Sequence, residues 1–184
     1  MYRTFITLPF LLLVLAFNTH TLLPDYKVSS GSISFRSDAP LELIKAQSGE
    51  LKGLVIPDRK QFAFIVNVKS FKGFNSPLQQ EHFNENYLES NKYPVASFEG
   101  KIIEDIDFTK DGEYAIRSKG NLSIHGVVQE HIIKCDVSIK NKNISVRSAF
   151  TVLLADHNIP IPKVVNEKLA SEIKVDIKAE LVIK

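Results

Sequence analysis

The sequence predicts an all-β fold, a closed antiparallel barrel of about eight strands with one or two short helices. From Asp25 onward, apolar and polar residues alternate with a period of two. Turn sequences separate the alternating runs, and several of the runs are long. Long strands suit a sheet that curls and closes, because closure removes exposed edges. A β-sandwich is the alternative architecture.

Length and composition favour one globular domain. The 184 residues, 44% hydrophobic and 24% charged, suffice for a sizeable core, and no repeat or linker divides them. The net charge of +2 comes without a basic run, which argues against a nucleic-acid surface. The single cysteine, Cys135, excludes an internal disulfide and alternates with Ile133 and Val137 as a small core residue would. The sequence leaves a homodimer open.

The N-terminus has the pattern of a secretory signal peptide. Arg3 is followed by an almost uninterrupted apolar run from Phe5 to Phe17 and then by short polar residues. The run is shorter than the roughly 20 residues that a membrane span requires. We therefore predict a signal peptide over residues 1–21, a β-barrel domain over 22–184, export to the periplasm or beyond, and no stable membrane span.

The strands follow from the alternation. "QFAFIVNVK" places Phe62, Phe64, Val66 and Val68 on one face. "NISVRSAFTVLL" groups Ile144, Val146, Phe150, Val152 and Leu154, and "SEIKVDIKAELVIK" groups Ile173, Val175, Ile177, Leu181 and Ile183. Each run predicts a strand with one buried and one solvated face.

Three turn signals separate strands. Asp111-Gly112 is the strongest short-range hairpin signal in the chain. "KNKN" at 140–143 and the dipeptide His125-Gly126 each predict a further turn.

The run "EYAIRSKGNLSIHG" bears on the barrel interior. The face that carries Tyr114 and Ile116 continues through Ser118 and Gly120 to Leu122. Gly120 marks either a bend that helps the sheet curl or, with Ser118, room for a cavity, and the two interpretations are compatible. A barrel of about eight strands is just wide enough to hold one small ligand.

One segment interrupts the alternation. Pro77 can begin a helix, and Leu78, Phe83, Tyr87 and Leu88 fall on one side of it. Pro94 ends the helical segment, and "VASFEGKIIEDIDF" resumes the strand pattern with Phe98 facing inward. The segment is predicted to be a short amphipathic helix that folds onto the barrel as a lid or flank.

The sequence does not indicate an enzyme. His82 and Glu85 have a spacing that could present two metal ligands, but solvent-facing roles are commoner, and we predict no metal site and no cofactor. Glu81, Glu85 and Glu89 are expected to form a solvated face. No carboxylate pair and no G-x-S-x-G motif stand out.

The segments "SFKGFNSPLQQEHFNENYLESNKYPVASFEGKI", "GNLSIHGVVQEH" and "ADHNIPIP" resemble the YceI-like family. The resemblance covers roughly residues 25–184. It implies a secreted bacterial domain with a lipocalin-like antiparallel barrel that is associated with polyisoprenoid or other long apolar lipids.

Two functions follow. The first is a secreted carrier or scavenger that holds a long-chain apolar ligand in the barrel; the alternative is a stress-related or surface-interaction domain with a packed barrel and no lipid. A buried methylene contributes about 0.8 kcal/mol and association costs about 4 to 15 kcal/mol, so the ligand should be long. The residues expected to line the cavity or form the lid are Phe62, Phe64, Phe83, Tyr87, Phe98, Tyr114, Ser118, Gly120 and Phe150.

Overall fold

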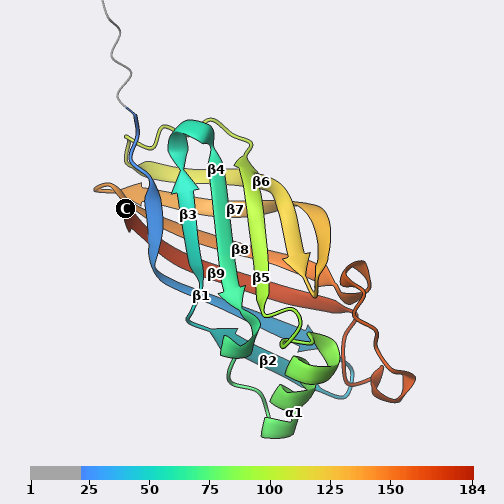
Figure 1. Cartoon of the computed structure of the whole chain (residues 1–184). Helices are drawn as coiled ribbons and strands as arrows, with labels where there is room; N and C mark the ends of the chain where they lie inside the picture. The colour runs from blue at the N-terminus through green and yellow to red at the C-terminus, as the bar shows by residue number, and fades with distance from the viewer. Residues whose placement is uncertain (1–21) are drawn as a thin grey trace, which may run out of the picture.

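The structure, a computed structural model, describes residues 22–184; the predicted signal peptide lies outside them. Nine strands dominate it (Figure 1): β1 (Tyr26–Asp38), β2 (Leu43–Ser48), β3 (Lys52–Ile56), β4 (Gln61–Asn67), β5 (Val95–Ile102), β6 (Gly112–Ile124), β7 (Val127–Lys140), β8 (Asn143–Leu153) and β9 (Glu172–Ile183). The helical elements are short: α1 (Pro77–His82), the π-helical turn η3 (Phe83–Tyr87), and the 3₁₀ turns η1 (Pro57–Arg59), η2 (Val68–Ser70), η4 (Leu154–His157) and η5 (Lys163–Val165).

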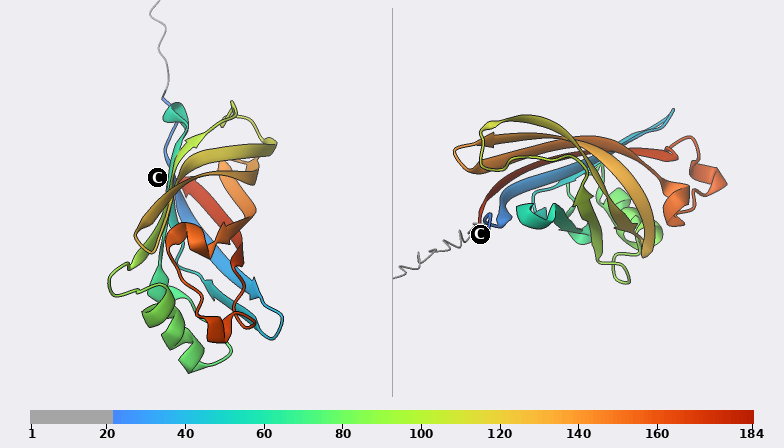
Figure 2. Two further views of the ribbon diagram at one scale, coloured as in Figure 1. Left: turned by 90° about the vertical axis from the view of Figure 1, so that its right-hand side faces the viewer. Right: turned by 90° about the horizontal axis from the view of Figure 1, so that it is seen from above.

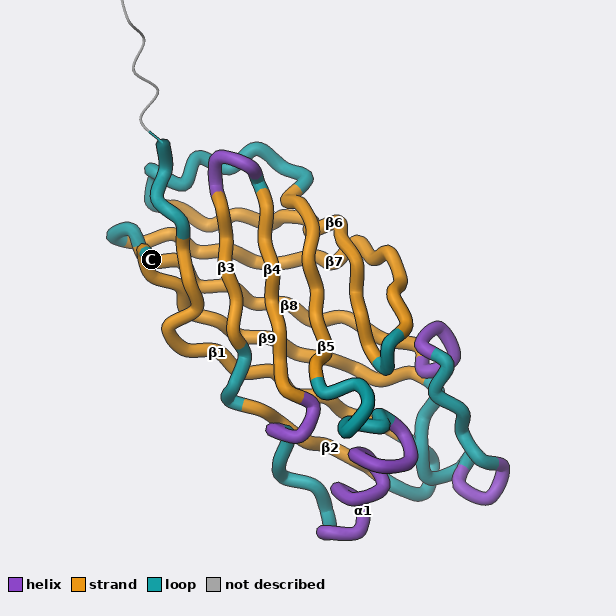
Figure 3. The backbone as a smooth tube through the Cα atoms, in the orientation of Figure 1, coloured by secondary structure: helices purple, strands orange, loops and turns teal. Residues whose placement is uncertain are grey.

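The sheet closes into an antiparallel barrel, as predicted. The strands from β3 to β9 pair in sequence order, and β1 closes the barrel by pairing with β9 from Tyr26 to Ser37. The other side of β1 is shared, since β3 pairs with its beginning and β2 pairs with residues Ile33–Asp38. β2 is thus a ninth strand on an eight-stranded barrel. Figure 3 shows β3–β5 crossing over β7–β9, so that two walls of the barrel face each other.

The wall is incomplete between β7 and β8. β7 pairs with β6 along nearly its whole length, but it pairs with β8 only from Asp136 to Lys140. Beyond that point a side chain bridges the two strands, because the Ser148 hydroxyl donates to the Lys134 carbonyl at 2.7 Å.

Two of the three predicted turns are tight hairpins. His125 and Gly126 have φ of 53° and 72°, and Asn141 and Lys142 have φ of 51° and 63°. Positive φ at both central residues is the geometry that twisted two-residue hairpins require. The prediction for Asp111-Gly112 is wrong in detail. Gly112 begins β6 at the end of a longer connection in which the Asp107 carboxylate accepts hydrogen bonds from the amide and hydroxyl of Thr109.

One end of the barrel is packed solid. Side chains from all sides meet there, and Leu181, Ile144 and Ile139 are at most 2% exposed. The predicted inward faces of β4, β8 and β9 are observed, except that Ile183, the last residue of β9, is 42% exposed. Both ends of the described chain and the turn η1 lie near this packed end, and the other helical segments gather at the opposite end (Figures 1 and 2).

The two glycines Gly100 and Gly120 face each other across β5 and β6. A β-carbon on Gly120 would collide with the Glu99 carbonyl, and one on Gly100 would collide with the Lys119 carbonyl. The two backbones can approach this closely only without side chains. The contact favours the interpretation of Gly120 as a site of sheet curvature.

The predicted helical interruption is present and is split in two. Ser76 caps α1, because its hydroxyl accepts a hydrogen bond from the Gln79 amide at 3.1 Å, and Pro77 occupies the first turn. α1 passes directly into η3, which carries Phe83 and Tyr87. We call residues 76–90 the insertion. Figure 1 shows it across the end of the barrel near β2.

Candidate functional site

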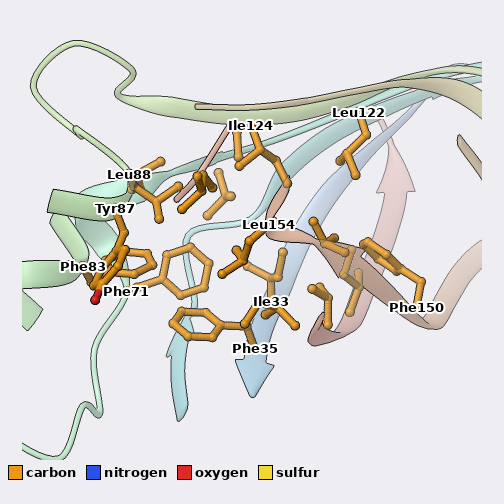
Figure 4. A pocket seen from close by; sticks show the side chains of 18 of the residues that line it. Ile33, Phe35, Phe71, Phe83, Tyr87, Leu88, Leu122, Ile124, Phe150 and Leu154 are labelled. Atoms are coloured by element: carbon orange, nitrogen blue, oxygen red, sulfur yellow. The ribbon is translucent and has the colours of Figure 1, made fainter. Parts of the chain in front are cut away.

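A cavity of about 500 Å³ occupies the half of the barrel opposite the packed end. Its wall consists of inward side chains of the strands, the insertion and the segment that follows β8. Figure 4 shows aromatic rings and aliphatic side chains converging on it from several elements. The volume lies within the range of small-molecule sites.

Seven of the nine residues predicted from the sequence border this cavity. They are Phe62 and Phe64 of β4, Phe98 of β5, Ser118 of β6, Phe150 of β8, and Phe83 and Tyr87 of the insertion. Their role in binding remains a prediction.

Tyr114 and Gly120 do not border the cavity. Tyr114 lies at the packed end, where its hydroxyl donates to the Lys110 carbonyl at 3.2 Å. Gly120 is covered by the opposing backbone of β5. Both residues lie on the inward face of β6, as the alternation predicted. Alternation does not reveal which part of an inward face borders a cavity and which part is packed.

An aromatic cluster closes one end of the cavity. Phe83 of η3 stacks on Phe35 of β1, with ring centroids 5.3 Å apart and an interplanar angle of 14°. Phe71 and Phe74 complete the cluster, at 5.8 and 5.1 Å from Phe83. Tyr87 and Leu88 extend the insertion's apolar side over the cavity (Figure 4). The insertion is therefore a cover held by stacked rings.

A second cover follows β8. Residues 154–169 place Leu154, Ile159 and Leu169 against the cavity. The segment is tethered, since the Leu41 amide donates to the Glu167 carbonyl at 2.8 Å and the Ala170 amide donates to the Ser37 hydroxyl at 2.9 Å. Figure 2 shows this segment and the insertion at the same end of the barrel.

Sequence reasoning missed several lining residues. Phe35 belongs to a strand whose alternation is visible in "SISF", but it was not among the predicted site residues. Phe71 and Phe74 lie in the connection between η2 and α1, where no periodicity marks their direction. Ile159 lies beside a 3₁₀ turn and is equally hidden from periodic analysis, whereas Leu154 continues the alternation that was predicted for β8.

The ionisable side chains that border the cavity lie at the covered end. They are Glu42, His82 and Lys168. The Gln79 amide donates to Glu42 at 2.8 Å, so the insertion is joined to the β1–β2 connection there. We call this end the mouth of the cavity.

A histidine network joins the insertion to the β6–β7 turn. His125 faces Glu89 through Nε2 at 2.7 Å, and its Nδ1 faces the His157 carbonyl at 3.1 Å. Glu81 and Glu85 are exposed as expected, but this pairing removes Glu89 from the predicted solvated row. His157 is fully buried and donates through Nδ1 to the Val127 carbonyl at 3.1 Å. Within residues 22–184, no three His, Cys, Asp or Glu side chains gather in a way that could hold a metal ion.

Cys135 borders the cavity from β7. Burial raises the pKa of its thiol, which keeps the sulfur protonated and poorly nucleophilic at neutral pH.

In the described part of the chain, no helix has the length and apolar character needed to cross a bilayer.

Solved structures share this fold. A polyisoprenoid binding domain from Saccharophagus degradans aligns with a TM-score of 0.74 at 14% identity, over 86% of this chain and 98% of that one. BcnA of Burkholderia cenocepacia aligns with a TM-score of 0.66 at 13% identity, over 82% and 95%. The Campylobacter jejuni YCEI protein aligns with a TM-score of 0.52 at 13% identity, over 97% and 91%. At these identities the likeness shows a common fold.

No protein with a curated description matches the sequence. The family model for the YceI-like domain matches residues 26–181, which runs from the first residue of β1 almost to the end of β9. A match over this much of the barrel confirms the resemblance seen in the sequence: the chain belongs to the YceI-like domain family.

Proposed function

We propose that the protein binds a long apolar lipid, of the polyisoprenoid kind, inside the barrel and acts as a carrier or scavenger. The observation that carries this proposal is the cavity of about 500 Å³ lined mainly by Phe, Leu, Ile and Val side chains. An empty apolar cavity of this size destabilises a fold by roughly 24 cal/mol per Å³, so an occupant would stabilise it. The Saccharophagus degradans domain, described as polyisoprenoid binding, supports this class of ligand.

The proposed role is binding without catalysis. The ionisable groups at the mouth are one carboxylate, one imidazole and one amine, and Glu42 is already bonded to Gln79. The arrangement can hold and cover a hydrocarbon chain. The alternative of a solidly packed barrel has less support, because the packing is solid at one end only.

We further propose that residues 1–21 direct export and are removed. The pattern of Arg3 and the apolar run to Phe17 motivates this proposal. Intact mass of protein recovered from its host should place the first residue between Asn18 and Asp25. A mass that retains Met1 would contradict export by cleavage.

Native mass spectrometry followed by organic extraction tests the binding function. Protein purified from its own host compartment should carry a long hydrocarbon that the extraction releases. If repeated preparations are empty and the protein takes up no long-chain compound offered to it, the carrier function is wrong.

A further inference from the structure

A small polar group lies deep in the cavity, next to the packed end. Moving along β6 from the packed core, Ile116 is fully within the core and Ser118 is the first side chain to border the cavity. On β7 the first side chain to border the cavity is Cys135, which pairs with Ile116 in the register, and Ser148 lies beside it on β8, directly after the last β7–β8 residue pair. We call these three side chains, which come from adjacent strands, the floor group.

The floor group has unused hydrogen-bonding capacity. Ser118 is 6% exposed, and among the described residues its hydroxyl has one partner, the Cys135 sulfur at 3.8 Å. A thiol is a weak partner. The Ser148 hydroxyl donates its hydrogen bond to the Lys134 carbonyl, so its oxygen can still accept one. A buried hydroxyl without a strong partner is unfavourable in an apolar site.

The charge distribution limits what can satisfy the floor group. The ionisable side chains that border the cavity, Glu42, His82 and Lys168, belong to the mouth. A phosphate or carboxylate at the floor would be buried without a counter-charge, which is strongly unfavourable. An uncharged hydroxyl or carbonyl oxygen would gain a hydrogen bond there without that penalty.

We propose that the floor group binds an uncharged hydroxyl or carbonyl oxygen of the ligand, so that a long-chain lipid enters with its polar end first. Its hydrocarbon then runs past Leu122 and Phe150 toward the insertion, where Phe83 and Tyr87 cover the chain. This inference rests on the proposed lipid-binding function and specifies the chemistry and direction of the ligand.

Matched ligands of one chain length test the chemistry. The probes are 1-hexadecanol, hexadecane and hexadecyl phosphate, in competition with a fluorescent polyene, against wild type and the variants Ser118→Ala and Ser148→Ala. Each variant should bind hexadecanol about 3- to 10-fold more weakly and hexadecane as well as before. Ser145→Ala is the matched control, since Ser145 lies on the outer face of β8 and bonds to Glu180.

The outcomes are distinct. If no probe binds the wild type, the carrier function itself fails. Suppose that the probes bind, but that both alanine variants bind hexadecanol as tightly as wild type does, or lose as much affinity for hexadecane as for hexadecanol. The binding function then stands and the floor assignment is wrong. If hexadecyl phosphate binds best and Lys168→Ala weakens it, the polar end lies at the mouth and the proposed direction is overturned.

The only cysteine of the chain gives a second measurement of direction that needs no variant. Two sixteen-carbon probes carry a thiol-reactive haloacetyl group, one at the polar end and one at the tail. Labelling is measured at alkaline pH, because burial raises the pKa of this thiol. The polar-end probe should label Cys135 at least about 10-fold faster, by analogy with the rate gain from holding two groups together. Faster labelling by the tail-end probe overturns the proposal.

Discussion

At the scale of single residues, His157 is the clearest case of a group that the fold forces into one protonation state. Its ring is fully buried, and its Nε2 has no hydrogen-bond partner among the described residues. Burial lowers the pKa of His157 and the nearby His131 ring lowers it further, while the Val127 carbonyl and Asp156 act in the opposite direction. The folded protein therefore holds this ring neutral.

We expect acid to destabilise the protein through this residue. Below the ordinary histidine pKa of about 6.5, the unfolded chain binds a proton that the folded chain does not, so the free energy of unfolding falls as the pH decreases from there toward the lowered folded pKa. Asparagine in His157→Asn keeps a donor for Val127 and does not titrate. Urea denaturation at about pH 7.5 and 5.5 should show a smaller difference for this variant, whereas the exposed His82→Asn should behave as wild type. An equal pH dependence in both variants would contradict this account.

Gly120 gives a second prediction at this scale. A methyl group there would collide with the Glu99 carbonyl, so Gly120→Ala should destabilise the fold by about 1 to 3 kcal/mol, the usual effect of overpacking. Gly49→Ala is the control, since a β-carbon at Gly49 meets no atom within 4 Å. Thermal melting of the two variants compares the positions directly. If both melt as wild type, the close approach of β5 and β6 does not depend on glycine.

At the scale of elements, the insertion should act as a cover rather than as a metal site. Phe83→Ala removes the ring that stacks on Phe35 and packs against Phe71 and Phe74. Phe83 is only partly buried, so the loss of stability should be below the about 3 to 5 kcal/mol typical of a core phenylalanine, and bound lipid should dissociate faster. Glu85→Gln, on the exposed side of the insertion, is the matched control. Stopped-flow release of a fluorescent lipid and zinc titration distinguish the roles, and a damaging Glu85→Gln would contradict the role as a cover.

The insertion also shows where local sequence signals are sufficient and where they are not. Pro77 and the spacing of Phe83 and Tyr87 are local features, and they predict the start of the helix and its inward side. The pairing of Glu89 with His125 joins residues 36 positions apart, which no local pattern encodes. Asp111-Gly112 is a similar case: the dipeptide is a local hairpin signal, but it stands at the end of the long connection between β5 and β6.

At the scale of the whole molecule, alternation predicted the barrel and the inward faces because closure and burial of one face follow from the period of two. It did not predict where packing ends and the cavity begins. That boundary is set by how side chains from opposite walls meet, so Tyr114 and Ser118, four residues apart on the same face, lie in the core and beside the cavity respectively. Residues that cover the cavity from irregular segments, such as Phe71 and Ile159, were hidden because no periodicity marks the direction of their side chains.

The cavity volume sets a limit on chain length that binding measurements can check. At roughly 30 Å³ for a group the size of a water molecule, about 500 Å³ accommodates about 16 methylene-sized groups. Each methylene that enters should improve binding by at most about 0.8 kcal/mol, roughly fourfold, so the dissociation constants of alcohols from eight to about sixteen carbons should fall steeply. Longer chains must leave past the insertion into water, and their affinities should level off. Ser148→Phe, which fills the floor, should move this break to shorter chains. A steady gain beyond about twenty carbons would mean that the barrel expands around its ligand and that the packed end is not a fixed boundary.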